Sequence, residues 1–296
     1  MHNQQDNYIR GVLCIITSAF CFACMNICIR LAGDIPSVQK SFFRNLVAAV
    51  FAGLIIVKSF HGAEPISLHV QKEARLSLVM RCVFGTVGIL CNFYAVDHLI
   101  VADASILNKL SPFFAVIFSY VLLKEKILPF QAVCILAAFS GCLFIVKPGF
   151  HNTELVPALV GVCGGLGAGI AYTMVRKLGT MGMRGPIIVF YFSVFSCFIV
   201  TPWILLHFVP MTLRQTAALL LTGLCAAGGQ FSITAAYTYA PAKKISIYDY
   251  SQIIFAAVLG FVFFGEIPDM YSFIGYALVI AASVMMFWYN HDKNNS

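Results

Sequence analysis

Apolar runs of about twenty residues alternate with short polar links along almost the whole chain. This is the length that an α-helix needs to cross a hydrocarbon layer of ~30 Å. The links contain residues that end helices, among them Gly33, Pro148 and Pro268. The pattern therefore predicts an all-α polytopic membrane protein with ten transmembrane helices, at about 11–33, 38–58, 76–97, 102–123, 128–147, 155–177, 185–206, 216–239, 243–265 and 271–290.

The fourth and ninth apolar runs are similar to each other. The segment from Ala102 to Glu125 has a counterpart 141 positions later, from Lys243 to Glu266. At this offset the polar insertion Asn108–Lys109 coincides with Asp249–Tyr250. Ten spans in two copies give five spans per copy, and an odd number places the second copy upside down in the membrane, as in many secondary transporters. The sequence thus predicts two inverted five-helix repeats, at 11–147 and 155–290.

Most basic residues lie at the ends of the apolar runs. With the N-terminus in the cytoplasm, the inner segments hold twelve of the 19 Lys and Arg residues and the outer segments hold four, while Arg44, Arg81 and Lys109 lie within spans. Because cytoplasmic loops carry an excess of Lys and Arg, this count predicts that both termini are cytoplasmic. The basic residues form no patch, so the formal charge of +7 does not indicate a nucleic-acid partner.

The amino-acid composition also indicates a membrane protein. Sixty per cent of the residues are hydrophobic and 10% are charged, whereas about a quarter of the residues in soluble proteins are charged. The polar segment 1–10 precedes a long apolar run without an A-x-A-like cleavage site, which indicates a first transmembrane helix rather than a signal peptide. No feature that targets an organelle is present, so the expected location is the cytoplasmic membrane. The expected partners are the lipid bilayer and a small-molecule solute.

Eleven cysteines lie almost entirely within apolar runs, where a free thiol packs as a small apolar group. Cys21, Cys24 and Cys28 share one face of the first span, which resembles the start of a metal site. They lack a fourth ligand and a loop to shape one, so packing is the favoured interpretation. The sequence predicts no metal and no cofactor.

Two charged residues lie well inside their spans. A rise of 1.5 Å per residue places Lys109 about 10 Å below the outer surface and Asp249 about 9 Å above the inner surface. In a core of ~30 Å they are then about 10 Å apart along the membrane normal, too far for a simple ion pair. We expect them to face a water-filled cavity and to bind opposite ends of a zwitterionic or amphipathic solute, or to act at different stages of its passage. The alternatives are a snorkelling or neutralised lysine and a helix-end aspartate reached by water.

Pro112 predicts a kink beside Lys109, because proline cannot donate to the carbonyl of Asn108 four residues earlier. The free carbonyl, the Asn108 amide and the Lys109 amine would then form a polar cluster on a kinked helix. A kink that serves only packing is the alternative.

Further polar residues recur at helical spacing on the small-residue faces of other spans. These faces suit a cavity wall or close helix contact, and as cavity lining we select Asn26, Asn92, Gln230, Tyr237 and Gln252. For the ridge of Gly161, Gly165 and Gly169, helix packing is the favoured interpretation. We expect Arg44 to pair or to face water, and Arg81 to snorkel towards the inner surface.

An integral-membrane transferase is the main alternative function, with Asp97, His98 and Asp103 as its site. These residues lie together at the predicted outer end of the third and fourth spans. No HExxH, GxSxG or phosphate-binding glycine loop accompanies them, and a solvated outer loop explains them more simply. A scaffold or a channel is a third possibility, and a channel would show neither saturation nor counterflow.

Four segments carry a resemblance that covers nearly the whole chain: FFR at Phe42–Arg44, SPFFAVIFSYVLLKEKI at Ser111–Ile127, SGCLFIVKPG at Ser140–Gly149 and FFGEIPDMYSFIGYALVIAASV at Phe263–Val284. They are similar to EamA-type members of the drug/metabolite transporter superfamily. The resemblance implies ten helices in two inverted repeats, cytoplasmic termini and a central cavity, and family members move amino acids, amines, vitamins, nucleoside-like metabolites and drugs. Its most specific marks are Glu125 and Glu266, which we expect to be structural.

The sequence therefore predicts a carrier, not an enzyme, that works by alternating access. We expect Asn108, Lys109, Asp249 and Gln252 to contact the solute. Asp249 is also a candidate for binding a coupling proton, because apolar surroundings favour the neutral form of a carboxyl group.

Overall fold

The computed structural model describes residues 2–60, 69–123, 128–147, 155–239 and 246–292. The regular elements in these ranges are all helical: α1 (His2–Leu31), α2 (Ser37–Ser59), α3 (Lys72–His98), α4 (Val101–Asn108), α5 (Ser111–Leu123), α6 (Pro129–Val146), α7 (Leu155–Thr180), α8 (Gly185–His207), α9 (Leu213–Tyr239), the 3-10 helix η1 (Ser246–Tyr250), α11 (Ser251–Phe264) and α12 (Met270–Asp292).

Nine helical segments of the described ranges are long and apolar enough to cross a membrane, and a shorter apolar helix runs over Tyr248–Phe264. Each of the ten predicted spans coincides with one of these segments, and the ninth span is the short one. The chain is therefore a multi-pass membrane protein, and its described part is all-helical.

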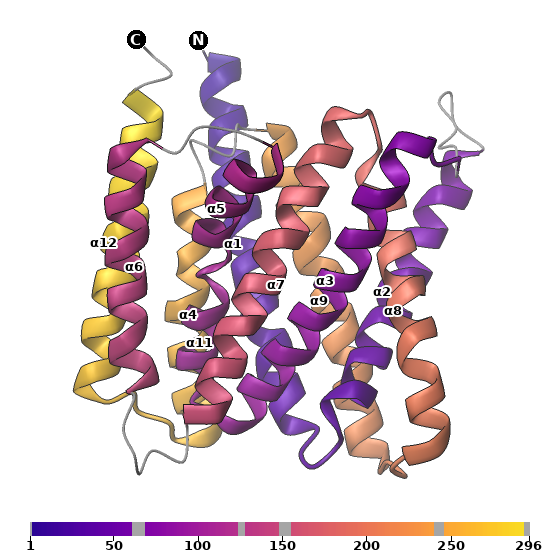
Figure 1. The fold of residues 1–296 in the computed structure, drawn as a ribbon. Helices are drawn as coiled ribbons and strands as arrows, with labels where there is room; N and C mark the ends of the chain where they lie inside the picture. Colours follow the sequence, from indigo (N-terminus) through magenta and orange to yellow (C-terminus); the bar gives the residue numbers. More distant parts are fainter. Residues whose placement is uncertain (1, 61–68, 124–127, 148–154, 240–245, 293–296) are drawn as a thin grey trace.

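The helices lie side by side in one bundle, and α1 begins at the same end of the bundle at which α12 finishes (Figure 1). The most extensive contacts join α3 to α7, α1 to α9, α6 to α12 and α2 to α8. Every one of these contacts connects a helix that precedes residue 147 with a helix that follows residue 155. The two predicted halves are thus interleaved, so a cavity at the centre of the bundle is walled by both.

Two of the spans are broken at the polar residues that the sequence singled out. Helix α4 ends at Asn108, and α5 begins at Ser111 after a short turn at Lys109 and Leu110. Pro112 lies in the first turn of α5, where the missing N–H causes no loss. In the second half, η1 carries Asp249 and leads directly into α11. The kink predicted from Pro112 is confirmed, and it is a full break.

Glycines on α7 allow α4 and α5 to approach its backbone closely. A Cβ atom at Gly165 would lie 2.6 Å from the carbonyl oxygen of Leu107, and one at Gly169 would lie 2.5 Å from the Cβ of Phe114. Both distances are too short for any larger residue. The packing interpretation of the glycine ridge is confirmed, and it fixes the position of the break relative to α7.

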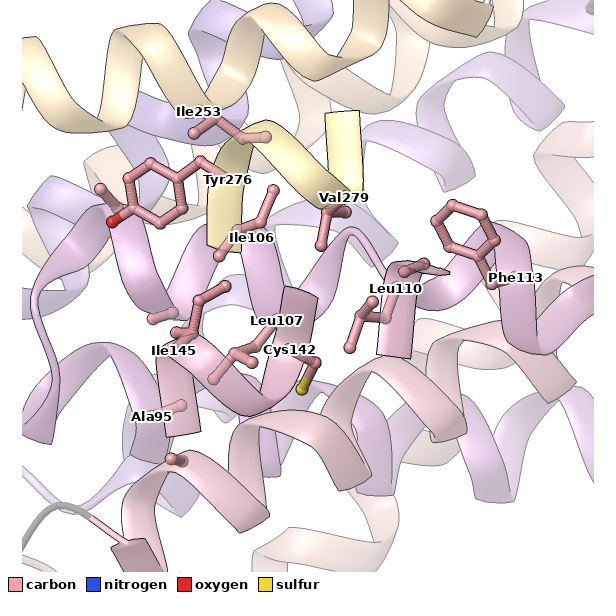
Figure 2. Packing of buried hydrophobic residues seen from close by; sticks show 14 of the residues in the cluster. Ala95, Ile106, Leu107, Leu110, Phe113, Cys142, Ile145, Ile253, Tyr276 and Val279 are labelled. Atoms are coloured by element: carbon pink, nitrogen blue, oxygen red, sulfur yellow. The ribbon is translucent and has the colours of Figure 1, made fainter. Parts of the chain in front are cut away.

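The apolar core surrounds α4 (Figure 2). Ile106 and Leu107 are fully buried and belong to one cluster with Ile145 of α6, Ile253 of α11 and Val279 of α12. Between membrane helices such contacts stabilise through close packing, because lipid tails are as apolar as the side chains themselves. The core therefore holds the short α4 rigidly beside the break that follows it.

Ion pairs join the helix ends at the end of the bundle opposite the termini (Figure 1): Arg30–Glu266, Lys40–Asp97 at 2.5 Å and Lys147–Asp269 at 2.7 Å. The Glu266 carboxylate also accepts a hydrogen bond from the backbone N–H of Val101 at 2.8 Å. One carboxylate thus connects the ends of α1, α4 and α11, in keeping with the structural role expected for Glu266. Glu125 lies outside the described residues.

Candidate functional site

A cavity of about 120 Å³ lies between the broken segments and the helices around them. Its walls come from both halves of the chain, through α1 to α4 on one side and α7, α8, α9, η1 and α11 on the other. Seven of the eight residues selected from the sequence line this single cavity: Asn26, Asn92, Asn108, Lys109, Gln230, Asp249 and Gln252. The eighth, Tyr237, lies on α9, and its side chain is outside the described part of the structure.

Lys109 and Asp249, which both line the cavity, form an ion pair with 2.5 Å between Lys109 Nζ and Asp249 Oδ2. Both side chains are mostly buried, at 10% and 18% exposed. The prediction that these residues are too far apart to pair is wrong. It assumed straight α-helices, but Asp249 lies in a 3-10 helix, which rises ~2.0 Å per residue instead of ~1.5 Å. The long lysine side chain covers the rest of the distance.

A second contact connects the two breaks. The hydroxyl of Tyr250 donates to the backbone carbonyl of Lys109, with 3.3 Å between the oxygen atoms. Lys109 is therefore held to the second half of the chain both by its side chain and by its backbone. The carbonyl group that accepts this hydrogen bond belongs to Lys109. The sequence predicted a free carbonyl at Asn108, one residue earlier.

Two buried acceptor oxygens at the cavity have no hydrogen-bond partner among the described residues. They are Asn26 Oδ1 and Asp249 Oδ1. The amide nitrogen of Asn26 is fixed by donating to the hydroxyl of Ser105 at 3.1 Å, so its oxygen is held in place as well. Buried polar atoms are rarely left unpaired. These two oxygens can accept hydrogen bonds from N–H or O–H groups of a bound solute.

Two arginines also line the cavity, although the sequence analysis gave neither a site role. Arg44 of α2 and Arg81 of α3 both place their guanidinium groups against the ring of Phe192 of α8. Arg81 is 9% exposed, so the expectation that it snorkels to the inner surface is wrong. Their position in the sequence could have identified both as cavity residues, since a charged residue inside a membrane span is costly and normally faces a cavity or a partner.

The residues of the alternative enzyme site have separate partners. Asp97 accepts hydrogen bonds from Lys40 Nζ at 2.5 Å and from Ser37 Oγ at 3.2 Å. His98 is exposed, and its Nδ1 lies 2.8 Å from the carbonyl oxygen of Tyr94. Asp97 thus joins the ends of α2 and α3, whereas the contact of His98 lies within α3.

Asp103 does not lie in a solvated loop, and that expectation is wrong. It is buried within α4 and accepts hydrogen bonds from the hydroxyl of Tyr276 at 2.5 Å and from that of Ser272 at 3.2 Å. The carboxyl group thus connects α4 to α12. Its position counts against a catalytic cluster that would also include His98.

The cysteines of α1 are free thiols in the structure. Within the described ranges, no group of three or more His, Cys, Asp or Glu side chains is placed to hold a metal ion. The cavity lining supplies charged and hydrogen-bonding side chains.

A sequence profile described as the EamA-like transporter family matches residues 9–147 and residues 155–288. The pseudopaline exporter CntI of Pseudomonas aeruginosa is 30% identical over 278 residues, which cover 93% of this chain and 95% of the exporter. Human solute carrier family 35 member G1 is 25% identical, over 96% of this chain and 81% of the carrier. A riboflavin transporter of Brucella anthropi is 25% identical, over 92% of this chain and 96% of the transporter. A solved structure, 15% identical, has the same fold with a TM-score of 0.64 over 93% of this chain and 96% of that chain.

Proposed function

Because the chain belongs to the EamA-like transporter family, we propose that it is a secondary carrier that moves a small organic metabolite across the cytoplasmic membrane by alternating access. The observation that carries this proposal is the cavity. Seven of the polar residues selected from the sequence line it from both halves of the chain, and two of them, Lys109 and Asp249, form an ion pair that joins the two helix breaks. Broken helices at the interface of two repeats are where secondary transporters bind their solutes.

The two separate family matches support an organisation of two repeats, 11–147 and 155–290. The start of α1 and the end of α12 lie at the same end of the bundle, which supports both termini on one side of the membrane. The distribution of Lys and Arg supports the cytoplasm as that side. The relatives named as an exporter of pseudopaline and a transporter of riboflavin support an organic metabolite as the solute. They also support a carrier over the transferase alternative.

In this proposal the polar lining binds the solute. Asn108 and Gln252 line the cavity with the ion pair, and Asn26, Asn92 and Gln230 contribute hydrogen-bonding groups from three further helices. Tyr237 is proposed as a solute contact from its position in the sequence alone. Alternating access then requires the end opposite the termini to open, which means that the pairs Arg30–Glu266 and Lys40–Asp97 separate and reform during the cycle.

Asp249 is the proposed site of a coupling proton. In the structure its carboxylate is held by Lys109, so protonation would release the lysine and weaken the link between the two broken segments. This gives proton binding a direct route to a change in conformation. If a pH gradient neither drives nor biases flux, this part of the proposal is wrong.

The test is counterflow in proteoliposomes against a panel of amino acids, amines, vitamins and organic acids. Three variants are compared with the native chain: Asp249→Asn, the double variant Lys109→Gln/Asp249→Asn, and Asp269→Asn as a control on an exposed acid outside the cavity. We expect saturable exchange of one solute class by the native chain and the control. Exchange should be lost or insensitive to pH in Asp249→Asn.

The outcomes separate the parts of the proposal. Exchange that survives unchanged in Asp249→Asn and in the double variant removes Asp249 from the pathway but leaves the carrier in place. Solute movement without saturation or counterflow indicates a channel. No exchange of any solute by the native chain contradicts the proposed function.

A further inference from the structure

Two guanidinium groups lie over the same aromatic ring inside the bundle. The central carbon of Arg81 is 4.0 Å from the centroid of the Phe192 ring, and that of Arg44 is 5.8 Å from it. The two carbons can be no farther apart than the sum of these distances, so one small solute can reach both. Together with Phe192, the pair also lines a second, smaller cavity of about 20 Å³.

Neither arginine has a carboxylate partner within the described part of the chain. The ion pairs found there engage Arg30, Lys40, Lys109 and Lys147 instead. The Nε atoms of Arg44 and Arg81 are buried and have no hydrogen-bond partner among the described residues. An unpaired charge inside a membrane protein is costly, and contact with one aromatic ring offsets only part of that cost.

The charge of the cavity lining follows from these contacts. Among the residues that the structure describes, its charged members are three cations, Arg44, Arg81 and Lys109, and one anion, Asp249. Arginine does not lose its proton in proteins. With Lys109 and Asp249 neutralising each other, two positive charges remain, and both are on the arginines.

The structure also holds the two guanidinium groups in place. Arg44 Nη1 donates to Asn45 Oδ1 at 2.7 Å, and Asn45 Nδ2 donates to the hydroxyl of Ser196 on α8 at 2.9 Å. The Arg81 side chain packs against Gly85, one turn later in α3. A Cβ atom at Gly85 would overlap Arg81 Nη1. Groups fixed in this way are preorganised for a ligand, because little side-chain entropy is lost on binding.

We propose that Arg44 and Arg81 bind an oxyanion group of the transported solute, a carboxylate or a phosphate, and that the solute carries net negative charge. This inference rests on the proposed carrier function and names its substrate class. The planar guanidinium fork matches either oxyanion with two parallel hydrogen bonds. The unpartnered oxygens of Asn26 and Asp249 then accept from hydroxyl or amino groups elsewhere on the same solute. The solute is thus an organic acid or phosphate ester that also has hydrogen-bond donors.

The experiment measures counterflow and thermal stability for the native chain and for Arg44→Gln, Arg81→Gln and Arg81→Lys. Arg214→Gln is the matched control, since Arg214 is exposed and outside the cavity. The solute panel contains malate, succinate and glutamate as carboxylates, glycerol 3-phosphate as a phosphate ester, and neutral and cationic analogues. The carboxylate and phosphate arms identify which oxyanion is bound.

We expect the native chain and the control to exchange an anionic solute and to be thermally stabilised by it. Each Arg→Gln variant should lose exchange or raise KM at least tenfold, and Arg81→Lys should recover part of the loss. Without solute, the melting temperature of the Arg→Gln variants should be unchanged or higher, because an unpaired buried charge has been removed. A purely structural role would instead lower the melting temperature together with flux.

Two results overturn the inference and leave the carrier in place. One is exchange confined to neutral or cationic solutes, and the other is anion exchange with native KM in both Arg→Gln variants. Failure of the native chain to exchange any solute contradicts the proposed function itself, and the inference falls with it.

Discussion

Two charged centres face the same cavity and differ in whether the protein supplies the opposite charge. Lys109 and Asp249 form a pair at 2.5 Å, whereas Arg44 and Arg81 have no acidic partner among the described residues and lie against Phe192. The paired centre lies at the two helix breaks, while the arginines lie on the regular helices α2 and α3. The difference indicates that the two charged centres have different roles in the same cavity.

In the paired centre, the charges of Lys109 and Asp249 neutralise each other without a ligand. It joins the break after α4 to η1, so it connects elements from the two halves of the chain, and its natural role is to fix their relative position. The charges of Arg44 and Arg81 are neutralised only when an anion occupies the cavity, because a buried charge needs a partner in a low dielectric. The first centre therefore suits conformational coupling and the second suits recognition.

Breaking the pair is the largest effect that we expect. Lys109→Met leaves the Asp249 carboxylate buried without its partner, and Asp249→Leu leaves the ammonium in the same condition. Removing one member of a buried pair typically costs about 3–5 kcal/mol. Each single variant should be destabilised by an amount of this order, reduced in proportion to the residual exposure of both side chains. Thermal unfolding of the purified protein in detergent measures the change.

The double variant Lys109→Met/Asp249→Leu sharpens the comparison. It removes both charges, so most of the lost stability should return, and the double-mutant cycle should show strong coupling between the two positions. Additive effects of the two single variants would mean that the pair contributes little. The arginine variants should behave in the opposite way, with loss of transport and no loss of stability.

Displacing one arginine without removing it gives an intermediate effect. In Gly85→Ala the new methyl group overlaps Arg81 Nη1 and lies 2.9 Å from Phe192 Cε2, so the guanidinium has to move. The backbone is not strained, since alanine is the best helix former. We expect KM for the anionic solute to rise about tenfold, equivalent to ~1.4 kcal/mol.

A second glycine provides the control for this prediction. In Gly53→Ala the added Cβ lies 3.6 Å from Phe190 Cε2, an ordinary contact, and transport should not change. Equal KM values for the two variants would show that the position of the Arg81 guanidinium does not affect binding.

The half-exposed pair Lys147–Asp269 is the reference for a charge pair outside the cavity, and it should give the smallest effect. Asp269 also accepts a hydrogen bond from the backbone N–H of Ser272 at 2.8 Å, which caps the start of α12. Asp269→Ala should lower stability by about 1 kcal/mol at neutral pH and leave transport unchanged.

The effect of Asp269→Ala should depend on pH. Partial burial raises the pKa of the Asp269 carboxyl, but hydrogen bonds from Lys147 and Ser272 outweigh this and hold the pKa below its ordinary value of 3.8. A lowered pKa stabilises the fold above the ordinary value, and this contribution disappears as the pH falls through the folded-state pKa. The difference in melting temperature between the native chain and the variant should therefore shrink from pH 7 to pH 3. The same difference at both pH values would show that the ionised carboxylate is not responsible.

The sequence by itself determined the apolar segments and where one of them breaks. Span length and hydropathy are local properties, and the bilayer requires every spanning segment to satisfy its own backbone groups, so the helices can be found without knowing their neighbours. Pro112 marks the break after α4 for the same local reason. Polar residues such as Asn26, Asp249 and Gln252 could be selected as cavity lining because membrane spans rarely contain them without a purpose.

Only the tertiary structure decided which of these groups meet. The pairing of Lys109 with Asp249 depends on the 3-10 geometry of η1 and on the reach of a lysine side chain, and neither follows from a residue count. Arg44 and Arg81 meet over Phe192 because α2, α3 and α8 have particular rotations about their axes, which are set by long-range packing. Asp103 is in the first turn of α4, beside a predicted outer link, but it is buried against Tyr276 in space. Depth along one helix can be counted from the sequence, but contact between helices depends on how all of them pack.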